Sequence, residues 1–126
     1  MDRVLKIAAA LSSYIVLTTT TAHAADAGHG KDLFDTKCAL CHNADKGGPN
    51  KIGPNLWGVT GRPSASLSSY SYSTAMQKAH LTWTVDVLEK YLLAPKAMLP
   101  GIRMTFTGFS KADDAADVAA YLSTLK

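Results

Sequence analysis

The sequence predicts an all-α domain in which short helices are joined by long loops. Apolar residues recur at helical spacing in several segments, whereas no stretch of useful length alternates apolar and polar residues. The chain has 126 residues, of which 47% are apolar and 18% are charged, and its formal net charge is +3. These values indicate one globular domain and exclude a multidomain enzyme, a polytopic membrane protein and a disordered chain. Because the charge is only weakly basic, no nucleic-acid partner is expected.

Residues 1–24 have the features of a secretory signal peptide. Arg3 and Lys6 give a positive start, an apolar run follows over residues 7–17, and Ala22-His23-Ala24 is a small-residue cleavage site. The alternative is a permanent membrane anchor, but the apolar run is shorter than the ~20 residues that a span requires. We therefore expect cleavage after Ala24, no stable membrane anchor, and a mature domain over residues 25–126 in a bacterial periplasm.

The first half of the mature chain is expected to hold one helix and one long loop. Residues from Ala27 to Cys41 can be helical, with Leu33 and Phe34 facing inward. Residues 47–73 are rich in Gly, Pro and Ser and show no sustained periodicity, which is typical of loops and turns.

Three further helices and a second loop are expected in the other half. A short helix covers residues 74–80, and Thr84 is placed to cap a helix through Leu93 that Pro95 stops. Prolines and glycines predict a loop over residues 94–109. Ser110 and Asp113 have the spacing of a capping box at the start of the last helix. One face of that helix carries Val118, Tyr121, Leu122 and Leu125.

So few short helices and such long loops would make a poor core from polypeptide alone. A cofactor in the middle of the domain would supply the missing apolar surface. The motif Cys38-Ala39-Leu40-Cys41-His42 is the strongest candidate for holding one. A pair of cysteines three residues apart, followed directly by His, is typical of covalent c-type haem attachment, with His42 as the proximal iron ligand.

Three other interpretations of the cysteine pair are possible, and each lacks something that it needs. A thioredoxin-like redox pair needs a βαβ setting, for which the sequence gives no sign. A zinc site needs two more ligands, for which only His29 and His80 remain. A structural disulfide would leave the large loops without a core. Covalent haem therefore accounts best for the motif.

A haem that transfers electrons needs a second axial ligand, and a methionine can provide it. The mature chain offers Met76, Met98 and Met104. Met104 is favoured because it follows the Pro100-Gly101 turn on an irregular segment, where its thioether could face a flat cofactor. Met98, which directly precedes Leu99-Pro100, remains the alternative.

From Gly30 to Leu122 the chain resembles the small class I cytochromes c, in particular the bacterial cytochrome c2 group and its mitochondrial relatives. The resemblance rests on the haem motif and on Gly30-Lys31-Asp32-Leu33-Phe34, Lys46-Gly47-Gly48, Gly53-Pro54-Asn55-Leu56-Trp57-Gly58, Gly61-Arg62, Tyr70-Ser71-Tyr72, Leu81-Thr82-Trp83, Tyr91-Leu92, Pro100-Gly101-Ile102-Arg103-Met104-Thr105-Phe106 and Val118-Ala119-Ala120-Tyr121-Leu122. It implies the small cytochrome c fold, wrapped around one covalent haem c.

The resemblance also implies roles for individual residues. Cys38 and Cys41 would bind haem covalently, with His42 and Met104 on the iron. The Pro54 carbonyl would accept a hydrogen bond from the His42 ring. The remaining haem contacts implied are Arg62, Tyr72 and Trp83 to the propionates, Tyr91 to the Met104 sulfur, and Phe106 over the haem edge. Met76 and Ile102 stand where mitochondrial relatives usually carry Asn and Thr, so the buried water network of those relatives is not expected to be conserved here.

The function implied is that of a one-electron carrier rather than an enzyme, with both axial positions filled. Its partners would be redox proteins of a respiratory chain, namely a cytochrome bc1-type reductase, a terminal oxidase or another periplasmic oxidoreductase. We expect a monomer that docks through a ring of basic residues at the haem edge, made of Lys37, Lys96, Arg103 and Lys111. The alternatives are a haem sensor or peroxidase-like enzyme with an open distal site, and a thiol oxidoreductase.

Overall fold

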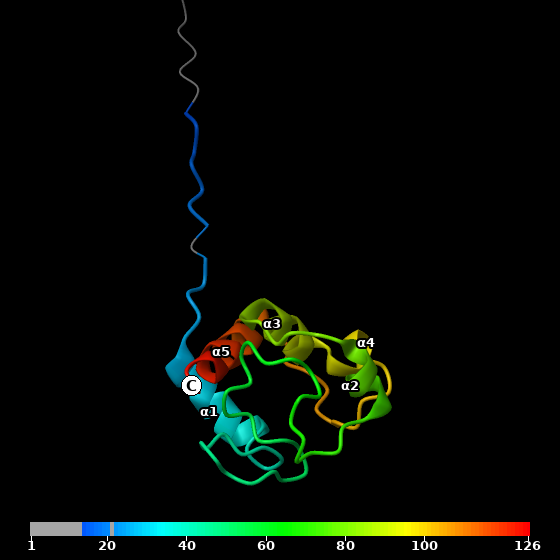
Figure 1. Ribbon diagram of the computed structural model, residues 1–126. Helices are drawn as coiled ribbons and strands as arrows, with labels where there is room; N and C mark the ends of the chain where they lie inside the picture. The colour runs from blue at the N-terminus through cyan, green and yellow to red at the C-terminus, as the bar shows by residue number, and fades with distance from the viewer. Residues whose placement is uncertain (1–13, 21) are drawn as a thin grey trace, which may run out of the picture.

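The computed structural model describes residues 14–20 and 22–126, and the regular elements of this part of the chain are five α-helices (Figure 1). The helices are α1 (Ala27–Lys37), α2 (Thr74–Ala79), α3 (Val85–Leu93), α4 (Pro95–Met98) and α5 (Ala112–Ser123). Apart from one isolated β-bridge between Pro63 and Thr82, the described residues contain no β-structure. The all-α prediction is confirmed for them.

Helices α1 and α5 pack against each other although they come from opposite ends of the domain, and α3 packs on α5 (Figure 1). Gly30 permits the close crossing, because a Cβ atom there would lie 1.9 Å from the backbone oxygen of Asp117. The Phe34 and Tyr121 rings meet beside this point, with centroids 5.4 Å apart. The buried core is made of Phe34, Val59, Trp83, Leu88, Tyr91, Leu92, Ile102, Phe109, Ala115, Val118, Ala119, Leu122 and Leu125.

Two of the predicted helices lie where the sequence places them. The side chain of Ser73 accepts a hydrogen bond from Met76 N–H at the start of α2, and the left-handed backbone of His80 ends that helix. Thr84 caps α3 as expected, accepting from the Val87 N–H, and the helix ends at Leu93. In both cases a hydroxyl satisfies a backbone donor that the first helical turn leaves unpaired.

The first helix is shorter than expected. It ends at Lys37 rather than Cys41, because the Phe34 carbonyl accepts from both Cys38 N–H and Ala39 N–H, which breaks the regular ladder. Asp26 caps its start by accepting from the N–H groups of Gly28 and His29. The cysteine pair therefore lies in a separate turn.

Two predictions for the second half were wrong. Residues 95–98, expected to be loop, form the short helix α4, because Pro95 stands at the first helical position, where its missing N–H costs nothing. The Ser110–Asp113 capping box is not formed. Helix α5 begins one residue later than the box requires, with Lys111 at the N-cap and no side-chain cap.

The predicted signal peptide falls largely on residues 1–13 and 21, which lie outside the described residues. Residues 14–20 and 22–26 are exposed and have no regular structure. Within the described ranges, no helix has the length and apolarity that crossing a membrane would require.

Candidate functional site

The Cys38–His42 motif forms a compact turn directly after α1. The Cys38 carbonyl accepts hydrogen bonds from Cys41 N–H at 3.0 Å and His42 N–H at 2.9 Å. Both cysteines are half-buried and neither is in a disulfide. One turn of backbone thus carries two thiols and an imidazole, the arrangement that covalent haem attachment requires.

The His42 ring is held in one orientation by the segment that carries Pro54. Its Nδ1 lies 2.8 Å from the Pro54 carbonyl oxygen. Because a carbonyl only accepts, Nδ1 carries the proton and Nε2 keeps a lone pair for a metal. The backbone of Gly53 passes close to the ring, and the Gly53 N–H donates to the Cys41 carbonyl at 2.8 Å. The His42 ring and the Gly53–Pro54 backbone are therefore held together.

The environment of His42 also favours the neutral imidazole that a metal binds. Burial lowers its pKa, the hydrogen bond to Pro54 acts in the opposite direction, and the charge of Lys51 lowers the pKa further. The net effect is a pKa below the ordinary histidine value, so the ring is uncharged at pH 7.

Asn55 is a positioning residue for which the sequence analysis assigned no role. It is 8% exposed, and its side-chain nitrogen donates to the carbonyls of Asp45 and Gly48 at 2.8 and 2.9 Å. Its side-chain oxygen accepts from Trp57 N–H, while its own N–H donates to Asn50. The Gly-Pro-Asn sequence indicated a turn, but only the folded chain brings these partners together.

The Cys38 thiol lacks the property that a redox-active nucleophile needs. Burial, and then the neighbouring Cys41, raise the pKa of Cys38 to about 11. A reactive thiol needs a lowered pKa, because the thiolate is the nucleophile. Among the described residues, the group of three potential metal ligands that lie close together contains neither cysteine, so the alternative of a zinc site built from the cysteines and His29 is not supported.

Met104 lies on an irregular segment that is tied to the loop before α2. Gly101 has a φ of +94°, and the Arg103 guanidinium donates to the Ser71 carbonyl at 2.7 Å. Met76, Met98 and Met104 are all half-buried against the core. Packing alone therefore does not choose between them, and Met104 differs from the other two only in standing outside a helix.

The three residues expected at the haem propionates are placed by different loops. Arg62 donates to the carbonyls of Trp57 and Asn55 at 3.2 and 3.3 Å, and the Tyr72 hydroxyl accepts from Leu67 N–H at 3.3 Å. Burial lowers the pKa of Arg62, an effect that a nearby anion would oppose. Trp83 is 7% exposed.

Tyr91 and Phe106 pack within aromatic pairs. The Tyr91 ring centroid lies 4.9 Å from that of Trp83, and Phe106 makes an edge contact with Phe109. Burial raises the pKa of Tyr91 to about 12. No hydrogen bond within the described residues joins Tyr91 to Met104, so the contact implied by the resemblance stays a prediction.

These residues fit a haem with acidic side groups. Within the described residues, neither the Tyr91 hydroxyl nor the Trp83 indole N–H has a hydrogen-bond partner, although both side chains are buried. Both donors are free to meet a bound group, which the resemblance makes a haem propionate for Trp83 and the Met104 sulfur for Tyr91. Met76 is half-buried and Ile102 is 9% exposed, so apolar side chains stand at both positions where mitochondrial relatives usually carry polar ones.

Comparisons with known proteins show which family the chain is similar to. A family model described as cytochrome c matches residues 27–126. A cytochrome c homolog of Rickettsia conorii is 47% identical over 100 residues, which is 79% of this chain but 57% of that protein, so this chain spans little more than half of it. Cytochrome c of Chlamydomonas reinhardtii is 46% identical over 105 residues, 83% of this chain and 94% of that protein. Cytochrome c of Gossypium barbadense is 46% identical over 97 residues, 77% of this chain and 87% of that protein.

Proposed function

The chain belongs to the cytochrome c family, and from this premise we propose that it is a carrier of single electrons rather than an enzyme. The observation that carries the proposal is the orientation of the His42 ring, whose Nδ1 lies 2.8 Å from the Pro54 carbonyl oxygen. The ring belongs to the same turn as two free cysteines. Haem c, the cofactor of this family, supplies an iron that alternates between Fe(II) and Fe(III).

The chain's own residues hold the haem and keep substrates away from it. Cys38 and Cys41 would hold the haem covalently, and His42 and Met104 would be the ligands of its iron. Arg62, Tyr72 and Trp83 would donate to the propionates, and Tyr91 would donate to the Met104 sulfur. Phe106, packed on Phe109, covers the haem edge. Burial and Met/His ligation favour the reduced iron and so raise the reduction potential.

The axial ligand is tested by replacing each candidate methionine with leucine in the haem-loaded protein. Met104→Leu should abolish the weak near-infrared Met–iron band of the oxidised protein and let the reduced protein bind CO at neutral pH. Met76→Leu and Met98→Leu are the matched controls and should keep the band. A wild-type protein that lacks the band and binds CO would instead indicate a sensor or a peroxidase-like enzyme with an open distal site.

Haem attachment is tested on the wild-type protein alone. Mass spectrometry in denaturant should find the mass of the chain plus one haem. Alkylation after reduction should find no thiol, because both sulfurs are in thioether bonds. Recovery of two reactive thiols would support the thiol oxidoreductase alternative and contradict the proposal.

We further propose that the leader is removed and that the mature domain works as a monomer in the periplasm. The support is the order of charged, apolar and small residues in residues 1–24. Protein isolated from the native cells should start at Ala25 and be released with the periplasmic fraction. A chain that keeps residue 1 and sediments with membranes would contradict this.

Docking to acidic partners is proposed to use the basic ring. Lys37, Lys96, Arg103 and Lys111 are all exposed. A bc1-type reductase, a terminal oxidase or another periplasmic oxidoreductase with an acidic face would be steered to them. Electron-transfer rates should fall as salt increases, and Lys96→Glu should slow them more than Lys126→Glu, which changes an exposed lysine outside the ring. Rates that rise with salt would refute electrostatic docking.

A further inference from the structure

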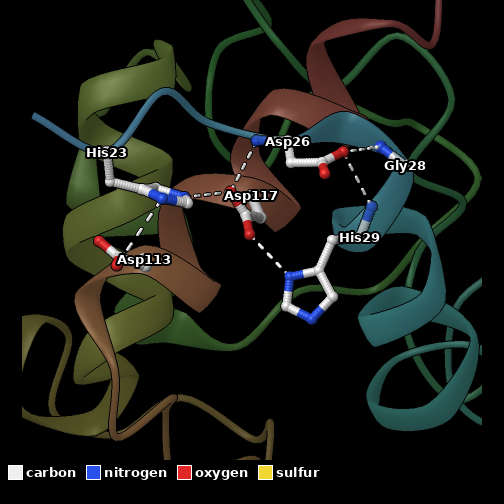
Figure 2. A network of polar contacts seen from close by, with 6 residues as sticks. All are labelled: His23, Asp26, Gly28, His29, Asp113 and Asp117. Carbon is white, nitrogen blue, oxygen red and sulfur yellow. Dashed lines mark hydrogen bonds and ion pairs between the residues drawn. The ribbon is translucent and has the colours of Figure 1, made fainter.

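A cluster of imidazoles and carboxylates lies where α1 crosses α5, and the electron-carrier function makes no use of it. Asp117 is at its centre, with its side chain 3% exposed. Its Oδ1 accepts from Asp26 N–H at 2.7 Å and lies 2.9 Å from His23 Nε2, while its Oδ2 lies 2.7 Å from His29 Nδ1 (Figure 2). The cluster thus joins the segment before α1 to the last helix.

Within the described part of the chain, the carboxylates of this cluster have no lysine or arginine as a partner. Asp26, Asp113 and Asp114 surround Asp117. Within residues 14–20 and 22–126, no lysine or arginine forms an ion pair with these carboxylates, and the groups that face them are the imidazoles of His23 and His29, of which His23 belongs to the leader proposed to be removed. When the histidines are neutral, the Asp117 carboxylate keeps the hydrogen bond from the Asp26 N–H but stands among other carboxylates with no Lys or Arg paired to it in the described residues.

His29, Asp114 and Asp117 are close enough to share one cation. One ligand atom from each lies within 4.8 Å of the other two. Asp117 is fixed by the Asp26 N–H, whereas Asp114 is only half-buried and the His29 side chain is 49% exposed. The more exposed side chains of Asp114 and His29 can therefore adjust until their ligand atoms lie about 2.0–2.2 Å from a shared ion.

We propose that His29, Asp114 and Asp117 form a binding site for a Zn²⁺ ion that links α1 to α5. One imidazole nitrogen and two carboxylate oxygens are a zinc-type ligand set with a fourth position open for water. The imidazole disfavours Ca²⁺ and Mg²⁺, which prefer oxygen ligands. The ion takes the place of the proton that His29 shares with Asp117, and it supplies positive charge at any pH.

Zinc and protons compete for His29. The hydrogen bond to Asp117 raises the pKa of His29, burial opposes the rise, and the charges of Asp117, Asp114 and Asp26 add to it. His23 faces the same carboxylate from the preceding segment. Zinc affinity should therefore increase as the pH rises through the pKa of His29.

The test is calorimetric titration of the reduced, haem-loaded protein with ZnCl₂ at pH 8, followed by NMR of the histidine rings. One ion per chain should bind and shift the His29 ring signals. His29→Gln and Asp114→Asn, which change partly exposed side chains, should each weaken binding by about tenfold or more. His80→Asn is the matched control, since it removes an exposed histidine elsewhere and asparagine tolerates the left-handed backbone of that position.

Unchanged zinc affinity in His29→Gln or Asp114→Asn would overturn the proposal, as would equal binding of CaCl₂ or loss of binding in His80→Asn. Affinity that fails to weaken at pH 6 would overturn it too. None of these results depends on electron transfer, so failure of the zinc site and failure of the proposed carrier function are distinguishable.

Discussion

Replacing Gly53 by alanine should disturb the His42 ring directly. A Cβ atom at this position would lie 2.3 Å from His42 Cε1 and 2.7 Å from Nδ1, whereas ordinary contacts begin at 3.4 Å. The ring must therefore retreat by about 1 Å, which breaks its 2.8 Å hydrogen bond to Pro54. An unpaired buried group costs about 1–3 kcal/mol, and overpacking adds about 1–3 kcal/mol. We expect the free energy of unfolding to fall by about 2–6 kcal/mol.

The assay is guanidinium unfolding of the haem-loaded protein, together with its reduction potential. Without the Pro54 bond the His42 ring is a weaker electron donor to iron, so the potential should rise. Gly47→Ala is the matched control, because its φ is +71° and nothing lies within 4 Å of an added Cβ. It should cost only about 1–2 kcal/mol of backbone strain and leave the potential unchanged. Equal unfolding midpoints and equal potentials for the two variants would refute this reasoning.

Three further outcomes are expected. Asn55→Ala should lower the free energy of unfolding by about 2–4 kcal/mol, since it removes three side-chain hydrogen bonds from a buried position. Denaturant titration measures this loss. A loss below about 0.5 kcal/mol, the size of an ordinary surface change, would contradict the positioning role of Asn55. The hydrogen bond to Asp117 raises the pKa of His29 in the folded protein above its unfolded value. With chelator present, His29→Gln should therefore destabilise the protein below pH 6.5, and the difference should vanish as the pH rises through the folded-state pKa of His29. A pH-independent difference in melting temperature would contradict this. The near-infrared Met104–iron band should persist until about pH 10 or above, because a lysine can replace the methionine only after losing its proton. Lys96 is the single lysine between Pro95 and Phe106, and it lies eight residues from Met104. Loss of the band well below that pH would reveal another ligand.

Local sequence predicted the parts of this molecule that local chemistry determines. Thr84 and Pro95 bracket α3 because a capping hydroxyl and a proline act on adjacent backbone. The Cys38–His42 turn could be identified because its function lies in the spacing itself. The start of α5 was misplaced, since Ser110 fits a cap by sequence but the packing of the helix on α1 and α3 sets its first turn at Ala112.

The supporting contacts could not be predicted in the same way. Asn55 meets Asp45 and Gly48, and Asp117 meets His29, only because distant segments come together in the fold. A buried asparagine or aspartate looks in sequence like any surface residue. The resemblance to a family supplied the role of Pro54, but it gave no role to Asn55 or Asp117.

The crossing of α1 and α5 fixes an order of events during folding. Residues 38–111 separate the two helices, so the contact at Gly30 cannot form until nearly the whole chain has reached the compartment in which it folds. Closing such a long loop is slow because of its entropy. Throughout that interval Cys38 and Cys41, half-buried in the finished domain, remain accessible on an open chain. The late arrival of the last helix therefore leaves a period in which a covalent group can be joined to the first part of the protein before folding covers it.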